Sequence, residues 1–291
     1  TIRATNQAAV AWPQWPSSAL DNLDGQVMKF CANLEAIAVL RVVEKDARAP
    51  TEDERAALLR FTGWGGIPAS FNLDGYDAPW KQRAQQLLDA LQPAEYESAK
   101  ASVNNSHYTD PRVIHWIWAA LRRLGFQGGN ILEPSAGVGH FLGCMPADIA
   151  QRSRVTAIEL DRVSGRILRS LYGACGVDVR IGGFEAATLA DGTYDLILSN
   201  VPFGRYGVLD NRNRPYSRAS IHNWFVGRAL DVADVHLRDL GRRGHQVVEQ
   251  RPGAEVAVVV VHQVLVQGAP YALGDRPRHL AVHDLGVDGP P

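Results

Sequence analysis

The segment Asp195–Gly204, DLILSNVPFG, places an amide and an aromatic ring directly after an apolar run. The run is typical of a buried strand, and side chains at the carboxyl end of a parallel strand face a ligand crevice. There the carbonyl oxygen of Asn200 can accept a hydrogen bond from an exocyclic amine, and the backbone carbonyl of Val201 can accept from its second proton. Pro202 stiffens the turn, and Phe203 offers a face on which a planar base can stack. The alternative interpretation is an Asn-capped turn with a Phe in the core.

A second group of residues is suited to a nucleotide cofactor. Gly137 and Gly139 follow a short expected strand, 130–134, and open a helix, where glycine lets the backbone approach a ligand closely. The spacing alone fits a dinucleotide loop, a plain tight turn or the seat of another nucleotide cofactor. Glu159 is the next acid at a strand end, and its carboxylate can accept hydrogen bonds from both hydroxyls of a ribose. The alternative for Glu159 is an acid near the cap of the following helix.

A hydroxyl pair, Tyr108-Thr109, stands before a helix that starts at Asp110-Pro111. The pair is suited to line the far side of a cofactor pocket, although by itself it is better explained as part of a helix cap.

These residues must be positioned by alternating elements. Strands are expected at 130–134, 154–161, 177–183 and 194–200, with helices at 113–126, after the glycine loop and at 162–175. Such alternation predicts βαβ units on a parallel sheet. Residues 1–100 are expected to be mainly helical, with helices at 26–45 and about 80–91, a capping box at Thr51 and a tight turn around a buried Trp64. Trp-Pro occurs twice in an irregular opening segment, at Trp12 and Trp15.

Taken together and in this order, the residues resemble the adenine-specific (N6) DNA methyltransferases. The matching motifs are Tyr108-Thr109, Glu133-Pro134 with Gly137 and Gly139, Glu159, Gly183-Phe184 and Asn200-Val201-Pro202-Phe203. The resemblance covers about residues 105–231. It implies a Rossmann-like S-adenosylmethionine-dependent methyltransferase fold, S-adenosylmethionine as methyl donor and an adenine amine in DNA as acceptor.

The resemblance also implies roles for individual residues. Catalysis would fall to Asn200, Val201, Pro202 and Phe203 by direct transfer to a base flipped out of the duplex, without a metal. The cofactor would be bound by Tyr108, Thr109, Glu133, Pro134, Gly137, Gly139, Phe141, Glu159, Phe184 and Glu185. Two positions depart from the family pattern: Val201 replaces the usual first Pro, and Gly183 stands where many relatives carry an Asp, for which Glu185 is the expected substitute.

The N-terminal region, together with NVPFG and GGFEA, is similar to large phage- and plasmid-borne proteins that join an adenine methylase to a helicase. This implies DNA as partner, and a helicase domain or protein beside it. Arg205, Arg212, Arg214 and Arg218 lie in a polar loop that we expect to contact phosphates, the alternative being a solvated loop.

The amino-acid composition limits which partners and which cellular locations are expected. The net charge of −1 gives no global basic field, so any contact with DNA must come from a local patch. Three cysteines without a CxxC pair, no signal peptide and no apolar run of about 18 residues predict a cytoplasmic protein without a membrane segment or a structural zinc. A non-catalytic fragment that binds cofactor or DNA and a protein glutamine methyltransferase remain alternatives. A nicotinamide dehydrogenase is disfavoured because it leaves residues 200–203 unexplained.

The chain is expected to divide into a helical region (1–100), a Rossmann-like core (101–231) and a biased segment (232–291). Apart from Tyr271, that last segment uses only the ten amino-acid types encoded by codons that begin with G or C. One interpretation is that the natural reading frame is lost near residue 231, which leaves a disordered segment and a sheet without its last strands. The other is a genuine segment whose Val-rich stretch, 254–266, forms a strand of the sheet.

Overall fold

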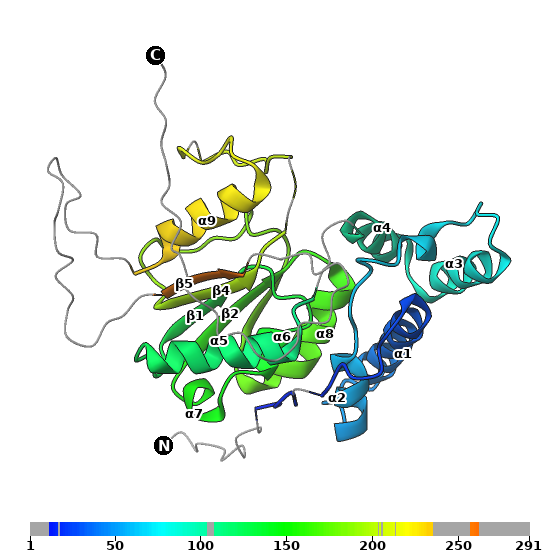
Figure 1. Ribbon diagram of the computed structural model, residues 1–291, viewed down its shortest axis with the longest axis horizontal. Coiled ribbons are helices and arrows are strands. Elements are labelled where there is room, and N and C mark those ends of the chain that lie inside the picture. The colour runs from blue at the N-terminus through cyan, green and yellow to red at the C-terminus, as the bar shows by residue number, and fades with distance from the viewer. Residues whose placement is uncertain are drawn as a thin grey trace, which may run out of the picture.

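The computed structural model describes residues 12–16, 18–103, 108–202, 204, 206–212 and 214–234, and the backbone of 257–261. Its centre is a sheet of five parallel strands in the order β3-β2-β1-β4-β5 (Figure 1). The strands are β1 (Asn130–Glu133), β2 (Arg154–Glu159), β3 (Asp178–Ile181), β4 (Leu196–Asn200) and β5 (Ala257–Val261). The order reverses between β1 and β4, which is the Rossmann-like arrangement, and ligands bind beyond the carboxyl ends of the strands at such a reversal. The predicted fold class is confirmed.

Helices cover both faces of this sheet (Figure 1): α9 lies on one face, and α5, α6 and α8 lie on the other. The helices of the core are α5 (Pro111–Arg123), α6 (His140–Gly143), α7 (Ala147–Ala150), α8 (Arg162–Tyr172) and α9 (Ile221–Val232), with a 3-10 turn at Gly173–Cys175. Successive residues of β4 pack into two different hydrophobic clusters. Leu196 and Leu198 join the larger core, whereas Ile197 packs under α9. Because both faces are covered, the strand is a continuous apolar run rather than an alternating one.

The N-terminal region is helical, as predicted. It contains α1 (Gln26–Lys45), α2 (Glu52–Leu59), α3 (Ala78–Ala90) and α4 (Pro93–Ser102), with a 3-10 turn at Pro68–Phe71. Thr51 and Glu54 form the predicted capping box at the start of α2. Trp64 is 1% exposed in a turn whose flanking glycines, Gly63 and Gly66, have positive φ. The expected tight turn with a buried ring is therefore confirmed.

An ion-pair network joins this region to the Rossmann-like core. Glu95 of α4 accepts hydrogen bonds from Arg41 of α1 and from Arg166 of α8, and Arg166 also binds Glu44 of α1. Glu95 is only 6% exposed, so its two arginine partners offset the cost of burying its charge. The network holds α4 beside α8 at the edge of the ligand crevice.

The fifth strand comes from the compositionally biased segment. The backbone of Ala257–Val261 pairs in parallel with Leu196–Asn200, in register from Leu196 with Ala257 to Asn200 with Val261. The sheet therefore continues beyond β4, as the interpretation of a Val-rich strand expects. Apart from 232–234 and this strand, the segment 232–291 lies outside the described residues. The frame-loss hypothesis and the three domain boundaries stay predictions.

Candidate active site

A cavity of about 1040 Å³ lies where the strands end, and it brings most of the predicted residues together. Its walls come from the ends of β1, β2, β3 and β4, from the start of α6 and from α4. The predicted residues that line it are Tyr108, Thr109, Glu133, Pro134, Gly137, Phe141, Glu159, Phe184, Glu185, Asn200 and Pro202. Gly139 and Val201 are not among the lining residues. Phe203 and Arg205 lie outside the described residues.

The floor of the cavity carries a buried acid at the end of β1. Glu133 is 1% exposed, and its Oε2 has no hydrogen-bond partner within the described residues. Burial, together with the negative charge of Glu159, raises the pKa of Glu133 well above its usual range. The buried Oγ1 of Thr109, which also lines the cavity, likewise lacks a partner in the described part of the chain. Buried polar atoms that are left unpaired cost free energy, so both atoms are suited to meet a polar ligand.

The second acid sits at the end of β2. Glu159 accepts hydrogen bonds at 2.7 Å from the backbone N–H of Gly137 and at 2.7 Å from the backbone N–H of Asp161. Burial, reinforced by the charge of Asp161, raises the pKa of Glu159 to about 7. The cap of α8 is Asp161 itself, which accepts from the backbone N–H of Ser164 at 2.8 Å. The structure therefore places Glu159 in the cavity, where a ligand can compete for it, and gives the capping role to Asp161.

The two glycines of the loop serve different purposes. Gly137 has φ +57°, and a Cβ there would lie 2.9 Å from the ring of Tyr108. Gly139 has φ +87°, and a Cβ there would lie 2.6 Å from the ring of Tyr172 and 2.7 Å from Leu168. The absence of a side chain at Gly137 thus leaves room for the ring of Tyr108 in the cavity wall. The absence of one at Gly139 lets α6 pack against α8.

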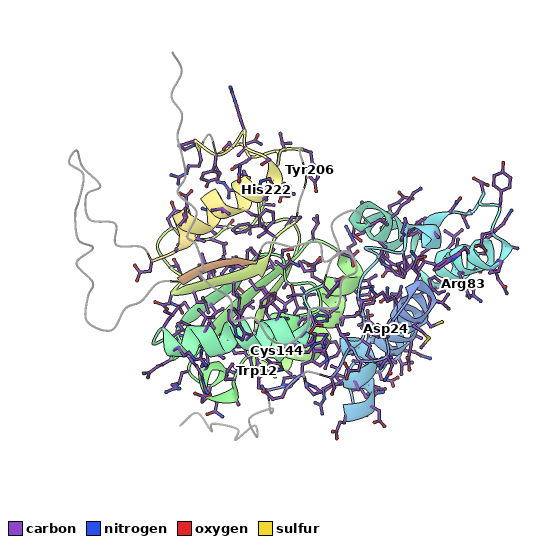
Figure 2. The ribbon with its side chains drawn as sticks, in the orientation of Figure 1. Trp12, Asp24, Arg83, Cys144, Tyr206 and His222 are labelled. Carbon is purple, nitrogen blue, oxygen red and sulfur yellow. The ribbon has the colours of Figure 1, made fainter. Side chains whose placement is uncertain are left out.

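The end of β4 carries the proposed amine-binding residues. Asn200 and Pro202 line the cavity, while the side chain of Val201 is 3% exposed in the core beneath α9. The role expected of Val201 concerns its backbone carbonyl and stays a prediction. Just beyond, the ring of Tyr206 covers the backbone of Gly204, where a Cβ would meet it at 2.2 Å. Tyr206 lies beside the start of α9 (Figure 2), lines the same cavity and is 47% exposed.

Glu185 lies beside the position after β3 where the family pattern carries an acid. An ideal Cβ on Gly183 would lie 1.9 Å from Oε1 of Glu185. The carboxylate of Glu185 therefore fills the space that a side chain at position 183 would occupy, and it does so on the cavity wall. This geometry supports the expected exchange of one acid for the other.

The polar loop after β4 is less open than expected. Arg212 pairs with Asp210 at 3.0 Å and stacks over Trp224, and Arg214 pairs with Asp191 at 2.9 Å. Arg218 is exposed and forms no ion pair with any described residue. A role in contacting phosphate stays a prediction for this loop, and among its described arginines Arg218 presents the freest guanidinium.

The structure adds residues that the sequence patterns did not assign. Ser98 of α4 donates to Asp161 at 2.9 Å, and both line the cavity, so the N-terminal region forms part of its wall. His140 also lines the cavity, is 3% exposed and makes a tilted contact with Tyr108 at 4.6 Å between ring centroids. Its position inside the glycine motif was a signal for His140. Nothing in the local sequence indicated Ser98, because its contact is made across 63 residues.

Within the described residues there is neither a cluster of metal ligands nor a membrane-spanning helix. His, Cys, Asp and Glu form no group of three or more there that could hold a metal ion. None of the described helices is both long and apolar enough to cross a membrane.

Similar proteins were found by sequence, although no family model matches the chain. The chain is 28% identical over 203 residues to Defense against restriction protein B of Escherichia phage P1, a match that covers 69% of this chain and 7% of the phage protein. It is 39% identical over 90 residues to the malonyl-[acyl-carrier protein] O-methyltransferase of Methylococcus capsulatus, covering 30% of this chain and 32% of that protein. The chain therefore spans less than a third of either curated relative that it matches.

A solved structure is also similar. A protein of Listeria monocytogenes, described as a class I S-adenosylmethionine-dependent methyltransferase, is 12% identical with a TM-score of 0.39, and the match covers 70% of each chain. The assignment of the Rossmann-like fold rests on the strand order of this chain itself.

Proposed function

We propose that the chain is an S-adenosylmethionine-dependent methyltransferase that modifies the exocyclic amine of adenine in DNA. The main observation behind the proposal is that residues predicted to bind the cofactor or the target amine come together in one place. Glu133, Gly137, Glu159 and Asn200 come from three different strand ends and line one cavity at the reversal of the sheet. The stretch that is 39% identical to an O-methyltransferase supports the methyltransferase class. The resemblance to a phage protein named for defence against restriction supports DNA as the substrate.

The lining residues fit S-adenosylmethionine in chemistry. The unpaired oxygen of buried Glu133 suits the cationic amino-acid end of the cofactor, and the Thr109 hydroxyl suits its carboxylate. The carboxylate of Glu159 suits the hydroxyls of the ribose, and that of Glu185 suits an adenine amine. When bound, S-adenosylmethionine supplies a methyl group on a positively charged sulfur.

Asn200 has the central part in catalysis. Its amide oxygen would accept a hydrogen bond from the target amine and hold the amine nitrogen in place to receive the methyl group that the cofactor would supply. An amide suits this task because it accepts the bond without removing a proton, so the amine stays a neutral nucleophile. Pro202 fixes the turn, and Phe203 is the residue predicted to hold the flipped base by stacking. Positioning of the two reactants accounts for most of the expected acceleration.

The decisive experiment measures methyl transfer from labelled S-adenosylmethionine to unmethylated DNA, followed by digestion to nucleosides and mass spectrometry. We expect N6-methyladenine from the wild-type chain, and a loss of about a hundredfold or more in Asn200→Ala, the scale of removing one catalytic hydrogen bond. Asn72→Ala, the same change at an exposed position of the N-terminal region, should keep full activity.

Each other outcome selects an alternative. Transfer that survives Asn200→Ala contradicts the site assignment. Cofactor binding without transfer to DNA selects a non-catalytic fragment, and methylated glutamine in added protein selects a protein methyltransferase. A helicase partner and a cytoplasmic location remain predictions alongside this proposal.

A further inference from the structure

The twofold Trp-Pro motif has no part in the proposed chemistry, yet it lies against the glycine loop. We call residues 12–16 the tryptophan strap. Proline disfavours helical backbone in the residue before it, so each Trp of the strap is biased toward an extended conformation. Trp12 donates its indole N–H to the carbonyl of Leu142 at 2.8 Å, and the backbone N–H of Trp15 donates to the carbonyl of Gly143 at 2.7 Å. The strap therefore runs along the end of α6.

These hydrogen bonds stabilise the end of α6. The last carbonyls of any helix have no partner within the helix, and a helix of four residues has almost no stability of its own. The strap supplies the donor to the carbonyl of Gly143 and a second donor to that of Leu142, which also accepts from the backbone N–H of Met145 at 3.1 Å. Just beyond the helix, the side-chain amide of Gln14 donates to the carbonyl of Met145 at 3.0 Å. His115 of α5 donates in turn to the carbonyl of Trp15 at 3.2 Å, which ties the strap to a longer helix.

A row of rings in tilted contact continues from the strap to the cavity. The ring of Trp15, which is 2% exposed, lies 3.6 Å from that of His140 between centroids. His140 lies 4.6 Å from Tyr108, whose ring is packed against the backbone of Gly137. His140, Tyr108 and Gly137 line the cavity, whereas Trp15 does not. Trp15 thus packs against a residue of the cavity wall without lining the cavity itself.

Gly143, the last glycine of the loop motif, allows Trp15 to lie this close to α6. A Cβ on Gly143 would lie 3.0 Å from Cβ of Trp15 and 2.7 Å from the hydroxyl of Tyr172. The glycine loop itself is conformationally permissive, since Gly137 and Gly139 both have positive φ. A loop of this kind binds a ligand well only if something else fixes its conformation beforehand.

We propose that the tryptophan strap is a positioning element of the cofactor site, which holds α6 and the glycine loop in the conformation that binds the cofactor. Trp15 is its principal residue, acting through His140 and Tyr108. The inference rests on the proposed function, because it takes S-adenosylmethionine as the ligand.

The test compares three variants by their thermal midpoint, their affinity for S-adenosylhomocysteine and the labelling of their thiols. Trp15→Ala should weaken binding about tenfold, within the range seen for changes between coupled sites. Leu87→Ala removes a fully buried side chain of α3, so it should lower the midpoint and leave affinity unchanged. Trp116→Ala, at a position 55% exposed on α5, should change neither.

Thiol labelling follows the strap without any cofactor. Cys144, labelled in Figure 2, is 2% exposed at the end of α6, two residues beyond the Leu142 carbonyl that Trp12 binds, whereas Cys31 is exposed. Trp15→Ala should speed the labelling of Cys144 and leave that of Cys31 unchanged, as read by mass spectrometry.

The outcomes separate the two proposals. Wild-type protein that binds no S-adenosylhomocysteine overturns the proposed function. Trp15→Ala that binds as tightly as the wild type, or that labels Cys144 no faster, overturns the strap. A loss of affinity in Leu87→Ala equal to that in Trp15→Ala would also overturn it, because general destabilisation would then explain both.

Discussion

Cofactor affinity should fall steeply in acid, because the carboxyl group of Glu159 has a pKa of about 7. The shift arises first from burial and then from the charge of Asp161. A folded-state pKa raised above the usual 4.5 means that the carboxyl is protonated below about 7. The protonated form accepts hydrogen bonds from ribose hydroxyls less well than the carboxylate does. Affinity should therefore be full above about pH 7 and lost as the pH falls.

The magnitude follows from a single titration. If only the ionised form binds, each pH unit below the pKa costs about tenfold, so affinity at about pH 5.5 should be some thirtyfold weaker than above neutrality. Glu133 titrates in the same direction, and its raised pKa depends partly on the charge of Glu159. Because the two acids interact, their apparent pKa values belong to the pair.

Calorimetric titration with S-adenosylhomocysteine, at fixed ionic strength between about pH 5.5 and 7.5, would measure this dependence below the titration of the ligand's amino group. Glu159→Gln should bind more weakly at neutral pH and show a flatter profile. Its residual pH dependence should move to lower pH, since Glu133 then loses a charged neighbour. An affinity that is constant over this range in the wild type, or a slope unchanged in Glu159→Gln, would refute the reasoning.

Two further changes test the glycines. Gly139→Ala should lower the free energy of unfolding by about 2–4 kcal/mol, because it adds both strain at φ +87° and a clash with Tyr172. Gly176→Ala, at the same φ but with no atom within 4 Å of the added Cβ, should cost only about 1 kcal/mol in the same urea titration. Gly183→Asp should abolish cofactor binding because its side chain collides with Glu185, and the double change Gly183→Asp with Glu185→Ala should restore it. If the double variant folds but does not bind the cofactor, Glu185 does not take the place of the acid expected at position 183.

Much of the architecture could be predicted from local patterns. The apolar run of β4, the capping box at Thr51 and the alternation of strands with helices all appear in the structure. These features depend on residues that are close in sequence, so their spacing is enough to reveal them. The gathering of Glu133, Glu159 and Asn200 could also be anticipated, because parallel strands end at the same edge of a sheet.

Residue type and short spacing were enough to predict strands β1 to β4, the glycine loop and the acids that face it, whereas the pairing of β5 with β4 was decided only in the structure. Tertiary structure decided which of two nearby acids caps α8 and which faces the cavity, and it put Glu185 in the space beside Gly183. It also brought Ser98 and Trp15 to the site from regions far along the chain. Such contacts depend on how whole helices pack. Packing joins residues that no periodicity connects, so these parts of the site became visible only in three dimensions.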